Sequence, residues 1–122
     1  MYPDLEGIEF DWFAKDCDGN LALFATGGEG FFPASVEAHH EKHICISESL
    51  SSPNIGTNSV WSDYAALGLF VFDWDVPGGP YKLRATPMRE ASAELVADIE
   101  AVPQLPRFSG CFSSFKELSK WR

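Results

Sequence analysis

Apolar and polar residues alternate near the start of the chain, with the period of two that is typical of a half-buried β-strand. The apolar positions are Ile8, Phe10 and Trp12, and the polar positions between them are Glu9 and Asp11. Asp18-Gly19 follows and favours a two-residue hairpin turn, because that turn needs positive φ angles. The apolar run over 21–25 then returns as the second strand. With a two-residue loop, the pattern predicts that Phe13 pairs with Phe24.

Two apolar segments on either side of Pro77-Gly78-Gly79-Pro80 predict a second hairpin, with these four residues as its loop. In that register Asp75 lies opposite Lys82 and Asp73 lies opposite Arg84, all on one face. Cross-strand pairs of opposite charge contribute roughly 0.2–1 kcal/mol each. We therefore expect both aspartates to be neutralised locally and to serve the fold. General acid or base catalysis by these two residues is the best enzymatic alternative.

Three further segments carry helix signals. The predicted helices cover 35–50, 62–67 and 92–102, and each begins with a serine as its N-cap. Pro103 ends the third helix because it cannot donate the backbone hydrogen bond that a helix interior requires. The stretch over 51–59 is rich in Ser, Asn, Gly and Pro and predicts a loop between the first two helices.

Hairpins and helices that alternate irregularly predict an α+β fold with a mainly antiparallel sheet. The chain has 122 residues, of which 45% are hydrophobic, so we expect a single domain over 1–122 with its own core. No apolar run approaches the ~20 residues of a membrane-spanning helix. The N-terminal residues also lack the basic and apolar regions of a signal peptide, so we expect a cytoplasmic protein without a membrane partner.

The composition is strongly acidic. Eighteen Asp and Glu residues oppose nine Lys and Arg residues, which gives a formal net charge of −9. Residues 1–61 contain ten acidic and two basic residues, so this half alone carries −8. Because an acidic chain repels phosphate groups, we expect no nucleic-acid partner.

The excess of acidic residues gathers around the first predicted hairpin. Its predicted face combines carboxylates with aromatic side chains, and the neighbouring loops add further acids. The residues of this candidate binding surface are Glu9, Asp11, Phe13, Asp16, Asp18, Phe24 and Glu29. A basic protein partner recognises such a surface through long-range attraction and central aromatic anchors. The alternative is that the first helix covers Phe13 and Phe24, while the acids only keep the protein soluble.

The first predicted helix contains three histidines. His39 and His43 are four residues apart, so both could reach one metal ion from a helix. The zinc-protease motifs place a glutamate at a different position between their two histidines. In the segment from His39 to His43, Glu41 is the third residue, so these motifs are not matched. We favour His39 and His43 as partly buried, hydrogen-bonded residues on the apolar side of the helix, with His40 and Glu41 facing water. We expect neither a metal ion nor another cofactor.

Cysteine usage gives no further catalytic signal. The three cysteines at 17, 45 and 111 are odd in number and widely spaced, which is typical of reduced thiols rather than a disulfide framework or a zinc site. Cys45 and His43 are two residues apart and point in different directions from a helix. The glycine-rich stretch over 27–30 favours a flexible connection, because it lacks the Lys-Ser/Thr of a phosphate-binding loop. The sequence therefore favours a non-enzymatic protein and leaves the question open.

The segment Asp11–Phe24 resembles a group of small bacterial proteins of uncharacterised function. The shared pattern is D-W-F-A-x-D-x-x-G-x-x-A-x-F, followed by a Gly-rich turn and Pro33. In size and acidity the chain is also similar to the immunity proteins of bacterial polymorphic toxin systems, which neutralise a cognate toxin by binding it. The resemblance implies an immunity-type inhibitor of a basic toxin.

A second function remains open beside inhibition. In this alternative, a pocket between the sheet and the histidine-bearing helix binds a small molecule or performs a reaction. The side chains expected to line that pocket are His39, His43, Trp12 and Trp74.

Overall fold

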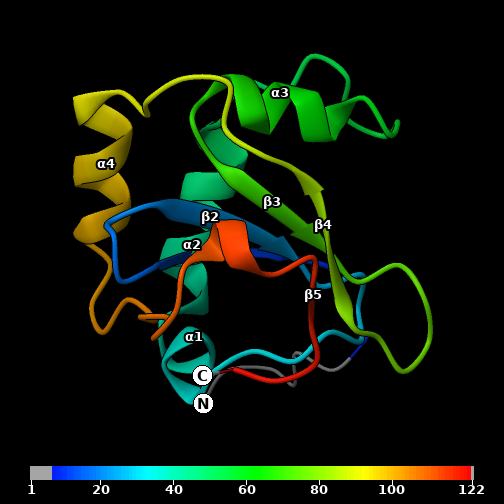
Figure 1. Cartoon of the computed structure of the whole chain (residues 1–122). Coiled ribbons are helices and arrows are strands. Elements are labelled where there is room, and N and C mark those ends of the chain that lie inside the picture. Colours follow the sequence, from blue (N-terminus) through cyan, green and yellow to red (C-terminus); the bar gives the residue numbers. More distant parts are fainter. Residues whose placement is uncertain (1–6, 122) are drawn as a thin grey trace.

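A sheet in the order β1-β2-β3-β4-β5 organises the computed structural model, which describes residues 7–121 (Figure 1). The strands are β1 (Asp11–Lys15), β2 (Leu21–Ala25), β3 (Phe70–Asp73), β4 (Tyr81–Ala85) and β5 (Glu117–Leu118). Only the β2–β3 pair is parallel, and the other three pairs are antiparallel. The predicted α+β class with a mainly antiparallel sheet is confirmed. The parallel pair and the short β5 are additions that the sequence pattern did not predict.

Helices α3 (Val60–Ala66) and α4 (Ala93–Glu100) pack on one face of this sheet, and the C-terminal segment packs on the other. The helices are α1 (Ala34–Ala38), α2 (His40–Ser49), α3 (Val60–Ala66), α4 (Ala93–Glu100) and a 3₁₀ turn, η1 (Phe112–Ser114). One buried cluster joins Leu23 and Val71 of the sheet to Tyr64 of α3 and Ile99 of α4. On the other face, η1 and the chain that follows it cross in front of the sheet, while α2 lies behind it (Figure 1). Strands β1, β2 and β3 are therefore buried on both sides, whereas β4 and β5 each expose a charged residue, Arg84 and Glu117.

The first hairpin has a register that differs from the predicted one by one residue. Trp12 pairs with Phe24, and Phe13 pairs with Leu23. The loop over 16–20 is longer than two residues, because the Asp16 carboxylate accepts backbone hydrogen bonds within it. A slip of one residue moves every side chain of a strand to the other face. Phe13 and Phe24 consequently lie on opposite faces, and the predicted shared surface is wrong.

Aromatic side chains fill the core beneath the C-terminal segment. The Trp12 ring stacks on Phe24 with a centroid separation of 4.3 Å, and Phe24 stacks on Phe72 at 4.8 Å. The indole Nε1 of Trp12 donates to the Tyr81 hydroxyl at 3.1 Å, which donates to the Phe31 carbonyl at 2.7 Å. This chain of hydrogen bonds satisfies two buried polar groups and fixes the orientation of both rings.

The second hairpin keeps its predicted ion pairs in a different register. Asp73 pairs with Lys82 across the ladder, two residues from the predicted alignment, and a bulge follows Val71. Because an even shift leaves side chains on their own face, the charged residues still meet. Arg84 Nε lies 3.8 Å from Asp73 Oδ2, and Lys82 Nζ lies 3.9 Å from Asp75 Oδ1. Arg84 also pairs with Asp75. The predicted neutralisation is confirmed, through diagonal contacts.

The helix predictions hold in part. The segment predicted as one helix breaks at His39, whose φ of −123° is not helical, so α1 and α2 are separate. The short α3 begins after Ser59 rather than Ser62. The start of α4 is confirmed, since the Ser92 hydroxyl accepts the Leu95 N–H at 3.1 Å. Within residues 7–121, no helix has the length and apolar character needed to cross a membrane.

Candidate functional site

A groove opens where the parallel strands β2 and β3 end, beside the start of β1 and between α2 and α3. Its volume is about 500 Å³. Four carboxylates line it, from Glu9, Asp11, Glu48 and Asp73, and we call it the acidic groove. Its apolar walls include Ile44, Ile55, Val60, Trp61 and Tyr64. The carboxyl ends of parallel strands are a frequent place for binding sites in sheets flanked by helices.

Secondary structure fixes the two inner carboxylates. Asp11 is the first residue of β1, and Asp73 is the last residue of β3. The Ser47 hydroxyl of α2 donates to Asp11 Oδ2 at 2.7 Å and so ties the helix to the strand. Arg84 approaches Asp73 from the neighbouring strand β4. Asp11 is therefore held by a residue of the groove wall, and Asp73 by a residue outside the groove.

The groove concentrates negative charge. Burial raises the pKa of Asp11 above its ordinary 3.8, and the charges of Asp73 and Glu9 raise it further against the opposing effect of the Ser47 hydrogen bond. Burial also raises the pKa of Asp73, while Arg84 opposes the increase. Among the described residues that line the groove, none is Lys or Arg. A cationic group entering the groove would relieve this repulsion and replace lost solvation.

The structure divides the binding surface that the sequence predicted. Glu9 and Asp11 lie in the acidic groove. Phe13 and Phe24 are fully buried, so neither offers a surface to a partner. Asp16 is 5% exposed and lies with the exposed Asp18 at the other end of β1, in the hairpin loop. Glu29 is exposed in the turn after β2.

Sequence reasoning missed the other half of the groove. Glu48, Trp61 and Tyr64 come from α2 and α3, which are distant in sequence from the first hairpin. These side chains come together only because the helices pack against the sheet, and no local sequence pattern predicts that packing. Asp73 was assigned to an ion pair with Arg84, which is correct but incomplete.

His40 and His43 are buried in the core, His39 is half-buried, and none of the three lines the groove. His43 is fully buried, and its Nδ1 accepts the Phe13 backbone N–H at 3.0 Å. Burial lowers the pKa of His43 to about 4, and the nearby His39 adds to this effect. His40 is buried as well, with Nδ1 3.1 Å from the Glu37 carbonyl, so the prediction that it faces water is wrong.

The predicted lining of the alternative pocket does not form this groove. Helix α2 contributes Ile44, Ser47 and Glu48 to it and none of its histidines. Trp12 is fully buried and Trp74 is half-buried, and neither lines the groove.

A second polar cluster lies at the opposite end of β1. The Sγ atoms of Cys17 and Cys111 are 3.4 Å apart, and the Cys111 thiol donates to Asp18 Oδ2 at 2.9 Å. Hydrogen bonds to Asp18 and Cys17 raise the pKa of Cys111 to about 12. All three cysteines are free. Wide spacing in the sequence therefore did not keep these two thiols apart.

Comparison with protein-family models, with curated proteins and with solved structures finds no significant match to this chain. Function is consequently argued from the geometry of the groove.

Proposed function

We propose that this protein binds a basic protein partner through the acidic groove and inhibits that partner, in the manner of a bacterial immunity protein acting on its cognate toxin. The observation that carries the proposal is a groove with four carboxylates, apolar walls and no Lys or Arg among its described lining residues. The proposal places the protein in the cytoplasm, where its partner would be neutralised and its thiols kept reduced.

The chemistry of the groove fits an arginine or lysine side chain of a partner. The aliphatic part of such a side chain packs on apolar walls such as Trp61, while its charged end meets Asp11 and Asp73. Charge-assisted hydrogen bonds of this kind are roughly twice as strong as neutral ones. A volume of about 500 Å³ leaves room for more than one inserted side chain.

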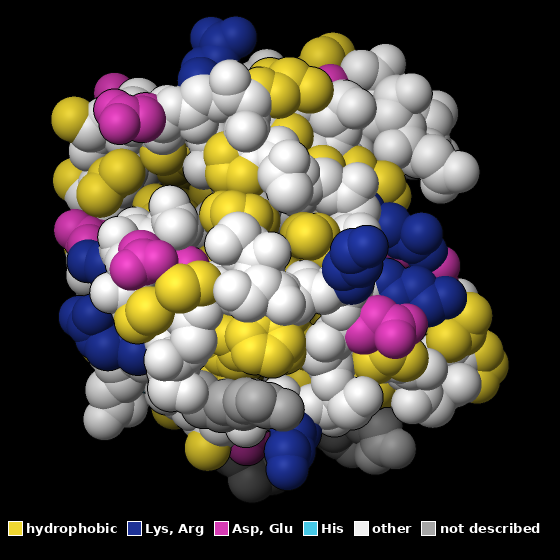
Figure 2. All heavy atoms as spheres, in the orientation of Figure 1, with side chains coloured by type: hydrophobic (Ala, Val, Ile, Leu, Met, Phe, Trp, Pro, Cys, Tyr) yellow, Lys and Arg dark blue, Asp and Glu magenta, His cyan; other side chains and the backbone are white. Residues whose placement is uncertain are grey.

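The rim of the groove offers apolar contact to a protein surface. Ile55 is 70% exposed beside the half-buried Trp61. Large apolar and aromatic side chains at the centre of an interface supply much of its binding energy, while surrounding charges guide association. On the face shown in Figure 2, Lys and Arg side chains gather beside β4 and β5, which disfavours that area for a basic partner.

The test begins with capture of the partner from the native host by the tagged full chain, followed by binding kinetics at two salt concentrations. The groove variant carries Glu9→Lys and Glu48→Lys. The matched control carries Glu37→Lys and Glu41→Lys, which alter the net charge equally at exposed positions outside the groove. We expect the groove variant to associate roughly tenfold or more slowly than the control. Equal association rates for the two variants would overturn the proposal.

Asp11→Asn tests the inner part of the groove. It retains the size of the side chain and an oxygen that can accept the Ser47 hydrogen bond. Loss of one partner of a buried charge pair costs about 2–5 kcal/mol, mostly through faster dissociation. An unchanged dissociation rate in a folded variant would show that no cation of the partner reaches Asp11.

A second candidate function follows from the same two aspartates. Burial raises the pKa values of Asp11 and Asp73, and the charge of Asp73 raises the pKa of Asp11 further. Raised pKa values are common among groups that bind or transform small molecules. A small cationic ligand is the alternative occupant. Calorimetric titration with guanidinium and diamine compounds tests this alternative. Binding of one of these compounds to the wild type but not to the Asp11→Asn variant, without competition from a protein partner, would favour a small cationic ligand.

A further inference from the structure

We propose that Cys17, Asp18 and Cys111 form a binding site for a thiophilic divalent metal ion such as Zn²⁺. The two thiols and the carboxylate place their ligand atoms within 4.8 Å of one another. This inference is independent of the acidic groove, which lies at the other end of β1.

The distances between the ligand atoms suit a tetrahedral ion. Two thiolates bound to Zn²⁺ at about 2.3 Å lie about 3.8 Å apart. The Sγ atoms of Cys17 and Cys111 are 3.4 Å apart, and Asp18 Oδ2 lies 2.9 Å from Cys111 Sγ. A small outward movement of the three side chains would bring these atoms to the spacing of ligands around one ion.

The backbone around both cysteines is already tied together, although they are 94 residues apart in sequence. The Cys17 N–H donates to the Gly110 carbonyl at 3.2 Å. The Phe112 N–H donates to Asp16 Oδ2 at 2.9 Å. These two bonds join residues 16 and 17 to the residues on either side of Cys111, so the two segments are held together before an ion arrives. Such outer contacts orient metal ligands and raise affinity.

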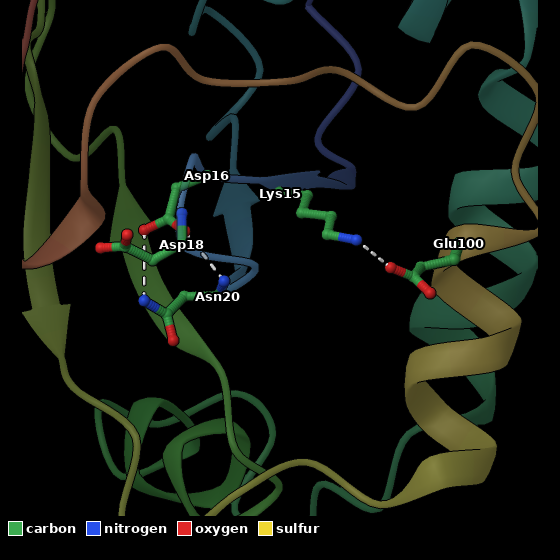
Figure 3. A network of polar contacts seen from close by, with 5 residues as sticks. All are labelled: Lys15, Asp16, Asp18, Asn20 and Glu100. Carbon is green, nitrogen blue, oxygen red and sulfur yellow. Dashed lines mark hydrogen bonds and ion pairs between the residues drawn. The ribbon is translucent and has the colours of Figure 1, made fainter.

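Asp16 organises the loop that carries two of the proposed ligands, Cys17 and Asp18. Its Oδ1 accepts the Asp18 N–H at 3.0 Å and the Asn20 N–H at 2.8 Å (Figure 3). The Asp16 carboxylate is thus engaged in the scaffold and leaves Asp18 as the carboxylate ligand. Lys15 extends away from this loop toward Glu100 of α4, so its ammonium group does not neutralise the site (Figure 3).

The donor set selects the class of ion. Two thiols and one carboxylate suit Zn²⁺ and related thiophilic ions, whereas Ca²⁺ and Mg²⁺ prefer oxygen donors alone. Cys17 and Asp18 are exposed and Cys111 is half-buried, so an ion can enter from solvent. Three protein ligands leave a fourth position for water or for an atom of a bound molecule.

The experiment titrates the reduced full chain with Co²⁺ under argon, and then adds Zn²⁺. We expect one Co²⁺ per chain, with the visible absorption of a tetrahedral ion and the near-ultraviolet charge-transfer absorption of thiolate ligands, both removed by Zn²⁺. Cys17→Ser and Cys111→Ser should each weaken binding by at least ~10-fold. The matched control is Cys45→Ser, which removes an exposed free thiol elsewhere and should bind as the wild type does.

A second readout uses the unmodified sequence and does not depend on the folding of any variant. Zn²⁺ should protect Cys17 and Cys111 from alkylation and leave Cys45 reactive, as read by peptide mass spectrometry. The proposal is overturned if no tetrahedral Co²⁺ spectrum appears, if Cys45→Ser removes it, or if Zn²⁺ protects none of the three thiols selectively.

Discussion

Asp16 holds two distant segments together, and its removal should be costly. The carboxylate accepts three backbone N–H groups, from Asp18 at 3.0 Å, Asn20 at 2.8 Å and Phe112 at 2.9 Å. Hydrogen bonds to a charged group contribute about 1.5–3 kcal/mol each. Because Asp18 and Asn20 are exposed, water replaces part of the loss there. The Phe112 N–H is in a buried contact, so we expect Asp16→Ala to destabilise the protein by about 3 kcal/mol.

Urea denaturation in the presence of a reductant measures this free energy of unfolding. Asp18→Ala is the matched control, since it removes the exposed carboxylate of the same loop and should change stability by less than about 0.5 kcal/mol. Asp16→Asn retains the shape and an acceptor oxygen, so it should fall between the two. In a thermal scan, the alanine variant should melt about 10 °C below the wild type.

Two results would refute this reasoning. A loss below about 1 kcal/mol for Asp16→Ala would mean that water satisfies the Phe112 N–H as well. An equal loss for Asp18→Ala would mean that the loop is stabilised by its total charge rather than by the geometry of the Asp16 carboxylate.

Three further predictions test the core. Tyr81→Phe leaves the buried Trp12 indole N–H without its acceptor, and a loss of about 1–3 kcal/mol in urea denaturation is expected; no loss would show that another group accepts it. The pKa of His43 is about 4 in the folded protein, whereas its ordinary value is 6.5. As the pH falls, the unfolded chain therefore binds a proton at His43 before the folded protein does. The free energy of unfolding should decrease between pH 6.5 and pH 4, by up to about 3 kcal/mol. His43→Asn should remove that pH dependence, and an unchanged slope would assign it elsewhere. Gly68→Ala should melt well below Gly56→Ala, because both have positive φ but a Cβ at Gly68 would lie 2.4 Å from neighbouring backbone; equal melting temperatures would contradict this.

Local patterns predicted the features that local contacts determine. The serine cap of α4 depends on two neighbours in sequence, Ser92 and Leu95, and it formed as expected. The ion pairs of the second hairpin tolerated an error of two residues in register, because the face of a side chain repeats with that period. Such features survive errors in the assumed alignment.

Features that depend on distant contacts were missed. The parallel pairing of β2 with β3 joins strands separated by α1, α2 and α3, and the alternation of residues contains no information about it. The register of the first hairpin depended on the side chain of Asp16, which lengthens the loop. That single difference placed Phe13 and Phe24 on opposite faces of the sheet, and both are buried there because each face is covered.

The acidic groove shows that an ion pair within one hairpin does not exclude a carboxylate from a binding site. Asp73 pairs with Arg84 across the second hairpin, which accounts for its charge when that hairpin is considered alone. The parallel pairing of β2 and β3 also brings Asp73 to the end of the sheet at which Asp11 begins β1. Glu9, Asp11 and Glu48 line the same groove as Asp73, and Arg84 is not among the lining residues. The surplus of negative charge is a property of the assembled sheet, and this surplus is what a basic partner would recognise.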